Sequence, residues 1–121
     1  MNEIKHKFDL EERTAKFGIA VIDFARKISE DSITRPLIVQ LVRAGTSVGA
    51  NYCEANDAES KKDFIHKIGI CKKEAHESMY WFHMIGVAVP ASKDAARKLW
   101  QEAKELNLIF AAIMKSAGYK K

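Results

Sequence analysis

Residues 40–54, QLVRAGTSVGANYCE, decide the fold of this chain. In and around this stretch, side chains recur at alternating spacings of four and three, at Leu37, Leu41, Ala44, Val48, the polar Asn51 and Ala55. Such spacing places one stripe of a helix against a partner helix. Gly45 and Gly49 lie four residues apart beside this stripe. Because glycine costs a helix about 1 kcal/mol relative to alanine, the pair indicates either a close approach of two backbones or two tolerated defects.

The same apolar spacing recurs in three further stretches of the 121-residue sequence. Only 2 prolines and 6 glycines interrupt the chain, 47% of residues are hydrophobic and 30% are charged, which is typical of helical bundles. We predict helices at residues 10–30, 35–57, 61–86 and 93–117. Their expected N-terminal caps are Asp9, Thr34 or Ser32, Ser60 and Ser92. Short connections predict a single all-α domain over residues 1–121, an up-down-up-down antiparallel four-helix bundle.

The chain contains no apolar run near the roughly 20 residues of a membrane span. Its first residues, MNEIKHKFDLEE, contain no apolar core of a secretory signal. We therefore expect a cytoplasmic protein that makes no contact with a membrane.

The cysteines Cys53 and Cys71 are expected to be reduced and to fill small spaces in the core. If the second and third helices turn back near Ala58, residues whose numbers sum to about 117 lie opposite one another. This pairing rule separates the two cysteines by about 10 Å along the helices. A disulfide requires closer Cα atoms, so none is expected.

Polar residues in the second and third predicted helices form a candidate set: Arg43, Ser47, Asn51, Glu54, Glu74 and Glu77. By the pairing rule, Arg43 lies opposite Glu74 and within one turn of Glu77. Arginine with a carboxylate is the ion pair best able to survive burial. We interpret the set as a structural network that fixes helix register or a subunit interface, with a ligand pocket as the alternative.

Catalysis and metal binding find little support in the sequence. His76 and His83 lie on one helical stripe, but about 10 Å apart along a straight helix, too far to share one ion. No arginine has a histidine within the next six positions, the arrangement of some helical ribonucleases. We expect no catalytic residue, no metal and no cofactor, and a nuclease-like enzyme is the last alternative.

Positive charge gathers in the second half of the chain. Residues 61–90 carry a net charge of +2 and residues 91–121 a net charge of +4, whereas residues 1–60 carry −2. A basic surface of this kind favours sequence-independent phosphate binding, although a solvated basic face is common. The candidate nucleic-acid-binding residues are Lys72, Lys73, Arg97, Lys98, Lys104, Lys120 and Lys121.

Aromatic residues exceed what one apolar stripe can bury. Tyr80, Trp81 and Phe82 are consecutive, and only Phe82 belongs to the stripe of the third helix. Tyr80 and Trp81 therefore cover other faces of that helix. Extra apolar surface of this kind predicts a homo-oligomer interface, with a different protein partner as the alternative.

The stretch RAGTSVGANYCEA, followed by SKKDF and KEAHESMYWF, carries a specific resemblance. The matching residues are Arg43, Ala44, Ser47, Val48, Asn51, Glu54, Lys62, Asp63, Phe64, Glu77 and Trp81. The pattern resembles the bacterial four-helix-bundle family encoded in intervening sequences of 23S ribosomal RNA genes, which also includes accessory variability proteins of diversity-generating retroelements. The match spans roughly residues 35–85.

This resemblance implies a homo-oligomeric ring, pentameric in family members, without known catalysis. For the retroelement branch it implies binding of RNA or DNA and of a protein such as a reverse transcriptase. Together with the charge distribution, it predicts a non-catalytic scaffold or accessory factor that binds nucleic acid, or a nucleic-acid enzyme, through a basic surface. A purely structural, self-associating protein with an unknown protein partner is the main alternative.

Overall fold

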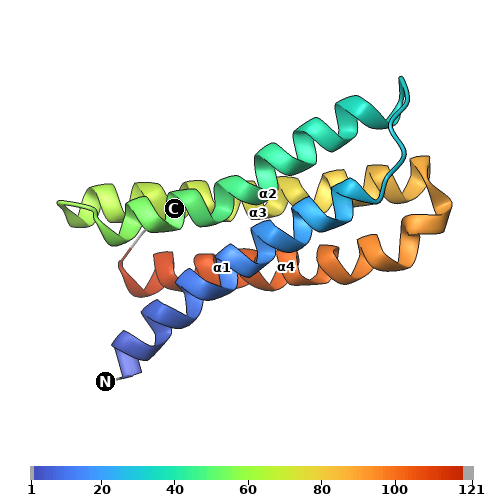
Figure 1. Cartoon of the computed structure of the whole chain (residues 1–121). Helices are drawn as coiled ribbons and strands as arrows, with labels where there is room; N and C mark the ends of the chain where they lie inside the picture. Colours follow the sequence, from blue (N-terminus) through green and yellow to red (C-terminus); the bar gives the residue numbers. More distant parts are fainter. Residues whose placement is uncertain (1, 119–121) are drawn as a thin grey trace.

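The computed structural model describes the backbone of residues 2–118 and the side chains of residues 10–118. Its helices are α1 (Asn2–Arg26), α2 (Thr34–Asn56), α3 (Lys61–Ala88) and α4 (Lys93–Ser116), with a 3-10 turn, η1 (Pro90–Ser92), leading into α4. Figure 1 shows α3 running beside α2 and α4, while α1 crosses the other helices obliquely. Each helix packs on its neighbour in sequence, and α1 meets α4 to close the bundle. The predicted all-α four-helix bundle is confirmed.

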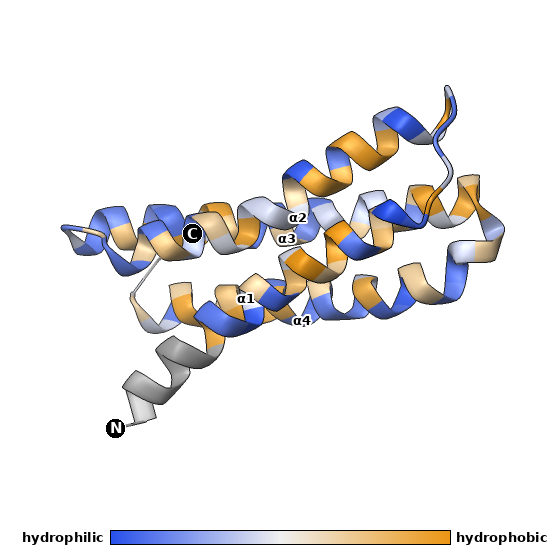
Figure 2. Ribbon diagram, in the orientation of Figure 1, coloured by the Kyte–Doolittle hydropathy of each residue, from blue (hydrophilic) through white to orange (hydrophobic). Residues whose placement is uncertain are grey.

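The core lies where the four predicted stripes meet. Phe82 of α3 is fully buried at its centre, and the rings of Phe17 and Phe24 from α1 approach it edge-on at centroid distances of 6.4 and 5.5 Å. Leu41 and Phe110 are also fully buried and bring α2 and α4 into the same cluster. Figure 2 shows hydrophobic and hydrophilic residues interleaved along the helices, as expected of amphipathic helices.

The crossing of α1 and α2 depends on glycine at position 45. A Cβ atom at Gly45 would lie 2.7 Å from Cγ2 and 2.9 Å from Cγ1 of Val21, which real Cβ contacts do not reach. At Gly49, a Cβ atom would lie 3.3 Å from Oγ1 of Thr14. The two glycines therefore mark a close approach of α1 and α2. Of the two interpretations drawn from the sequence, close packing holds and tolerated defects do not.

The two ends of α1 differ most from the prediction. The helix expected at residues 10–30 is observed as Asn2–Arg26, so Asp9 lies inside α1 and does not cap it. Nothing in the preceding residues, which contain no glycine or proline, stops the helix earlier. At the other end, Lys27 and Ile28 donate to carbonyls three residues back, which tightens the last turn.

The side chain of Asp31, and not that of Ser32 or Thr34, accepts hydrogen bonds from the backbone at the start of α2, whose N-cap position is Ile33. Its carboxylate accepts from the backbone N–H groups of Thr34 and Ile33 at 2.8 Å each, and these bonds lower its pKa. Ser60 caps α3 as predicted, accepting from the N–H of Asp63 at 3.0 Å. Ser92 does not cap α4, because its hydroxyl donates to the carbonyl of Val89 in η1.

Candidate nucleic-acid interface

Four basic residues of the second half of the chain, Lys72, Lys93, Arg97 and Lys104, lie along the groove between α3 and α4. Three contacts fix the register of the two antiparallel helices. Asn107 Nδ2 donates to the carbonyl of Lys72 at 2.9 Å, and a Cβ atom at Gly86 would lie 3.9 Å from both Cα of Lys93 and Cβ of Ala96. The facing sides of the two helices therefore run antiparallel from Asn107 and Lys72 to the turn η1, and we call this interface the α3/α4 groove.

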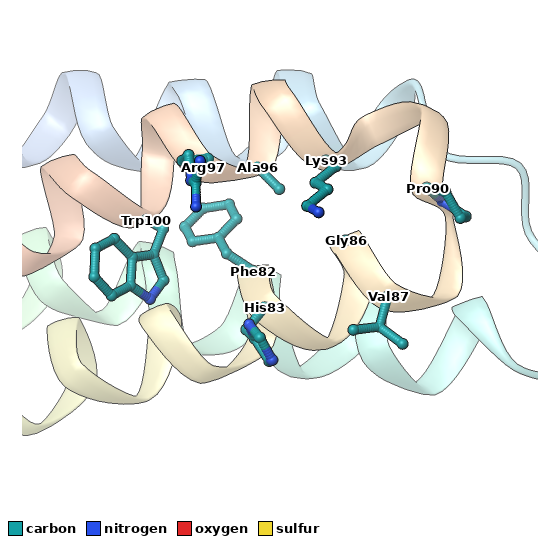
Figure 3. A pocket seen from close by; sticks show the side chains of 9 residues that line it. All are labelled: Phe82, His83, Gly86, Val87, Pro90, Lys93, Ala96, Arg97 and Trp100. Carbon is teal, nitrogen blue, oxygen red and sulfur yellow. The ribbon is translucent and has the colours of Figure 1, made fainter.

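A pocket of about 570 Å³ forms the end of this groove nearest η1. It is lined by Phe82, His83, Gly86, Val87, Pro90, Lys93, Ala96, Arg97 and Trp100. Figure 3 shows Trp100 at one end, Val87 and Pro90 at the other, and Lys93 and Arg97 reaching from α4 along one edge. Its volume falls within the range of roughly 300–1,000 Å³ that is usual for ligand pockets.

The predicted nucleic-acid-binding residues are accessible along this half of the molecule. Lys73, Arg97, Lys98 and Lys104 are exposed, and Lys72 is half-buried. Within the described side chains, none of these five cations forms an ion pair. Lys104 instead places its ammonium 5.5 Å from the centre of the Trp100 ring, a cation–π contact that leaves the charge free to meet an anion. Lys120 and Lys121 lie outside the described residues.

Acidic side chains of α3 and α4 are engaged on the flanks of the bundle. Arg13 of α1 donates from Nε and Nη2 to the two carboxylate oxygens of Glu102 at 2.9 and 2.8 Å, and Nη2 also reaches Glu105 at 3.2 Å. The hydrogen bonds with Glu102 raise the pKa of Arg13, so this group stays charged. On the opposite flank, Arg43 of α2 pairs with Glu74 and Glu77 of α3. Two arginines thereby hold four carboxylates on the flanks of the bundle, away from the α3/α4 groove.

The predicted polar set divides into separate parts. Arg43, Glu74 and Glu77 come together, and Trp81 joins them by donating from Nε1 to Glu77 at 3.0 Å. Ser47 and Asn51 bond only to carbonyls one turn back in α2. Glu54 pairs separately with Lys67 at 2.8 Å, and this bond raises the pKa of Lys67.

This network is a surface feature. The Arg43 side chain is 45% exposed, so the set neither occupies the core nor encloses a ligand pocket. Asn51 falls on the apolar row but is half-buried, and it satisfies its amide within its own helix.

The two predicted interface aromatics differ in exposure. Tyr80 is 55% exposed, whereas Trp81 is half-buried against the core. Their rings pack edge-on with centroids 4.9 Å apart. Ile33, Val39 and Val87, also exposed, belong to the same end of the bundle, where α2 begins and α3 ends.

The two cysteines also occupy different environments. Cys71 is buried in the core as predicted, and burial raises the pKa of its thiol to about 12. Cys53 is exposed, so its prediction as a core residue is wrong. It lines a shallow groove between α1 and α2, because it lies one position from the buried row of α2 at Tyr52. Both thiols are free.

Sequence reasoning missed His83 and Lys93 as lining residues and Arg13 as the partner of Glu102. The signal for the pocket was present in part, since Trp100 falls beside the apolar stripe of its helix. Within residues 10–118, no three histidine, cysteine or acidic side chains are grouped to hold a metal ion. None of the described helices is long and apolar enough to cross a membrane.

Comparison with known proteins places the whole bundle in one family. The model of the 23S rRNA-intervening sequence proteins matches residues 6–112. The fold is similar to the crystal structure of a protein of unknown function from the S23 ribosomal protein family of Bacteroides thetaiotaomicron VPI-5482, with 26% identity and a TM-score of 0.82. That match covers 90% of this chain and 97% of the other. No curated protein matches the sequence. The chain belongs to the 23S rRNA-intervening sequence protein family.

Proposed function

We propose that this protein is a non-catalytic, self-associating four-helix bundle that binds nucleic acid through the α3/α4 groove. The observation that carries the proposal is the set of unpaired cations along that groove, Lys72, Lys93, Arg97 and Lys104, within the described part of the chain. Lys73 and Lys98 add exposed positive charge on the adjoining faces of α3 and α4. Cations free of internal partners can exchange counterions for phosphates at little cost. The family name, which links these proteins to 23S rRNA genes, is consistent with such a ligand.

The proposed binding is independent of sequence. Lysine and arginine side chains on two antiparallel helices contact phosphates and carry no base-reading pattern by themselves. The shared ligand is therefore the phosphate backbone of RNA or DNA. A nucleic-acid enzyme such as a reverse transcriptase is a further partner suggested by the family resemblance.

Self-association is proposed through the end of the bundle that carries Tyr80 and Trp81. Exposed large hydrophobic side chains at this end, Ile33, Val39 and Tyr80, favour contact with another copy. The family resemblance suggests a pentamer. A ring would repeat the basic groove and multiply its attraction for phosphate. The same apolar surface supports the second candidate, a structural protein that binds only a protein partner.

The resolved pKa shifts of the bundle all have structural causes. The described groups with shifted pKa values are Arg13, Asp31, Tyr52, Lys67 and Cys71. Each shift follows from a salt bridge, a helix cap or burial in the core, and none of these residues lines the pocket.

Fluorescence anisotropy with a labelled RNA strand and a labelled DNA duplex tests the proposal. At low salt, both are expected to bind, because phosphate contacts dominate affinity. A protein that binds neither would contradict the nucleic-acid role and would favour the structural candidate.

A further inference from the structure

The pocket at the η1 end of the α3/α4 groove combines an aromatic ring, an apolar floor and a cationic edge. Trp100 stands at one end and Phe82 lies behind the opening (Figure 3). Lys93 and Arg97 extend along the α4 edge, and His83 lies on the α3 edge (Figure 3). A ligand that suits all three features is flat and apolar in one part and anionic in another.

An unpaired nucleotide has this chemistry. Its base offers a flat face for stacking on an aromatic side chain, and its phosphate pairs with arginine or lysine. A base inside a duplex is already stacked and paired, and it can enter such a pocket only after being unstacked at a cost of a few kcal/mol. The pocket therefore suits single strands better than duplexes.

We propose that this pocket receives one unpaired base of a single-stranded nucleic acid, stacked against Trp100, with the adjoining phosphate held by Arg97 and Lys93. The inference rests on the proposed function and adds a preference to it. Lys104, one helical turn farther from η1, places its ammonium 5.5 Å from the centre of the Trp100 ring, which adds a positive charge beside the stacked base.

Beyond the pocket, the interface of α3 and α4 carries two further cations, Lys72 and Lys104. Lys72 lies beside Asn107, seven residues along α4 from Trp100, which is about 10 Å at 1.5 Å per residue. Lys104 lies between them on the same helix. Phosphates that follow the stacked base would meet these cations in turn, which is the usual combination of a stacking platform with a basic track.

The test compares Trp100→Leu and Trp100→Phe for binding to fluorescein-labelled oligo(A) of about 12 nucleotides, as RNA and as DNA, and to a DNA duplex of similar length. Trp100→Leu is expected to weaken binding of both single strands about fivefold to tenfold, the low end of measured stacking contributions, at 1.4 kcal/mol per tenfold. Its duplex binding is expected to stay unchanged. Trp100→Phe retains an aromatic face and is expected to retain most of the single-strand affinity.

Both variants lose part of the indole packing, so circular dichroism and thermal melting verify that each is folded. An independent readout uses Trp81→Phe protein, in which Trp100 is the remaining tryptophan. Its fluorescence is expected to be quenched by the single strand and not by the duplex.

Three results would overturn the inference. Unchanged single-strand affinity in Trp100→Leu would show that no base stacks there. Equal losses for single strand and duplex would show that Trp100 acts only through the fold. The Trp100 fluorescence could also fall as the protein concentration rises and stay unchanged when oligonucleotide is added. That result would show that the pocket is a contact between proteins. If wild-type protein binds neither single strand nor duplex, the proposed function fails as well.

Discussion

Arg13 on the first helix and Glu102 on the last lie 89 residues apart in sequence and form a two-pronged salt bridge with N–O distances of 2.8 and 2.9 Å. The α1–α4 contact is the smallest of the helix–helix interfaces that close the bundle. The two side chains are 31% and 29% exposed, so water screens the pair only in part. This salt bridge therefore links α1 to α4 at the smallest interface of the bundle.

Removing the Arg13–Glu102 pair is expected to destabilise the fold. A double-mutant cycle with Arg13→Met and Glu102→Gln should give a coupling energy of about 1 kcal/mol, the upper end for exposed pairs, because the geometry is bidentate. Urea unfolding of the four proteins measures it. The control cycle uses Glu12 and Lys16, an exposed pair one turn apart on α1, with an expected coupling of about 0.3–0.5 kcal/mol. Equal coupling energies in the two cycles would contradict a special role of the Arg13–Glu102 pair in holding α1 against α4.

Two glycine-to-alanine substitutions are expected to act in opposite directions. Gly45→Ala would push a methyl group into Val21, whose branched side chain cannot rotate away freely, at a cost of about 1–3 kcal/mol. Gly69→Ala meets only Cε of Met114 at 3.5 Å, so the helix gains up to about 1 kcal/mol. Thermal melting should show a lower Tm for the first and a higher Tm for the second. A tolerated Gly45→Ala would mean that α1 and α2 are not held in this crossing.

Cys71 is expected to be unreactive in the folded protein. In Cys53→Ala protein, a disulfide-exchange reagent at pH 8 should modify Cys71 only after denaturant is added, because the thiol is buried and its pKa is raised to about 12. In Cys71→Ala protein, the exposed Cys53 should react at once. If the thiols of the two folded variants react with the reagent at similar rates, the burial of Cys71 is refuted.

The raised pKa of Cys71 also predicts a pH dependence of stability. Between the ordinary thiol pKa of 9.0 and the folded value of about 12, the unfolded chain releases this proton and the folded chain retains it. The free energy of unfolding should therefore fall as pH rises through this window. Cys71→Ala should show a shallower fall than the wild type, and parallel curves would exclude a contribution from this thiol.

Tyr80 is expected to support self-association. Tyr80→Ser removes the exposed ring that packs on Trp81 and should lower the mass found by light scattering. Leu108→Ser is the matched control, because Leu108 is 58% exposed on α4, away from the α2/α3 end. A wild-type protein that remains a 13.7 kDa monomer at micromolar concentration would contradict self-association, as would an equal effect of both substitutions.

Most of the fold could be predicted because the four apolar stripes are regular and the α2–α3 turn is short. Counting outward from that turn placed Arg43 opposite Glu74, and their N–O distance is 3.0 Å. Counting residues outward from a turn could not identify Glu102 as the partner of Arg13. Arg13 and Glu102 are separated by 89 positions and three connections, and no single turn fixes the register of α1 against α4.

The pocket was only partly accessible to sequence reasoning for a similar reason. Its opening depends on η1, which displaces the start of α4 from the end of α3, and Pro90 of that turn lines the pocket. The charge pattern identified Arg97 and Lys104, but the grouping of Lys93, His83 and Trp100 required the α3–α4 register. The exposure of Cys53 was missed because it lies next to the buried row and is itself apolar.

The salt dependence of nucleic-acid binding tests the central claim most directly. Fluorescence anisotropy across a salt series, with two unrelated DNA duplexes, compares the wild type with the Lys72→Gln, Lys73→Gln double variant. The matched control is the Lys16→Gln, Lys27→Gln double variant, which removes the same charge from the α1 side of the molecule.

A nucleic-acid interface at the α3/α4 groove predicts that log affinity falls with log salt, with a slope of about −0.9 per neutralised phosphate. This slope should become flatter by up to about twice that amount in the Lys72/Lys73 variant, equally for both duplexes, and should be unchanged in the control. Equal slopes for the two double variants would contradict the assignment of the α3/α4 groove as the nucleic-acid interface.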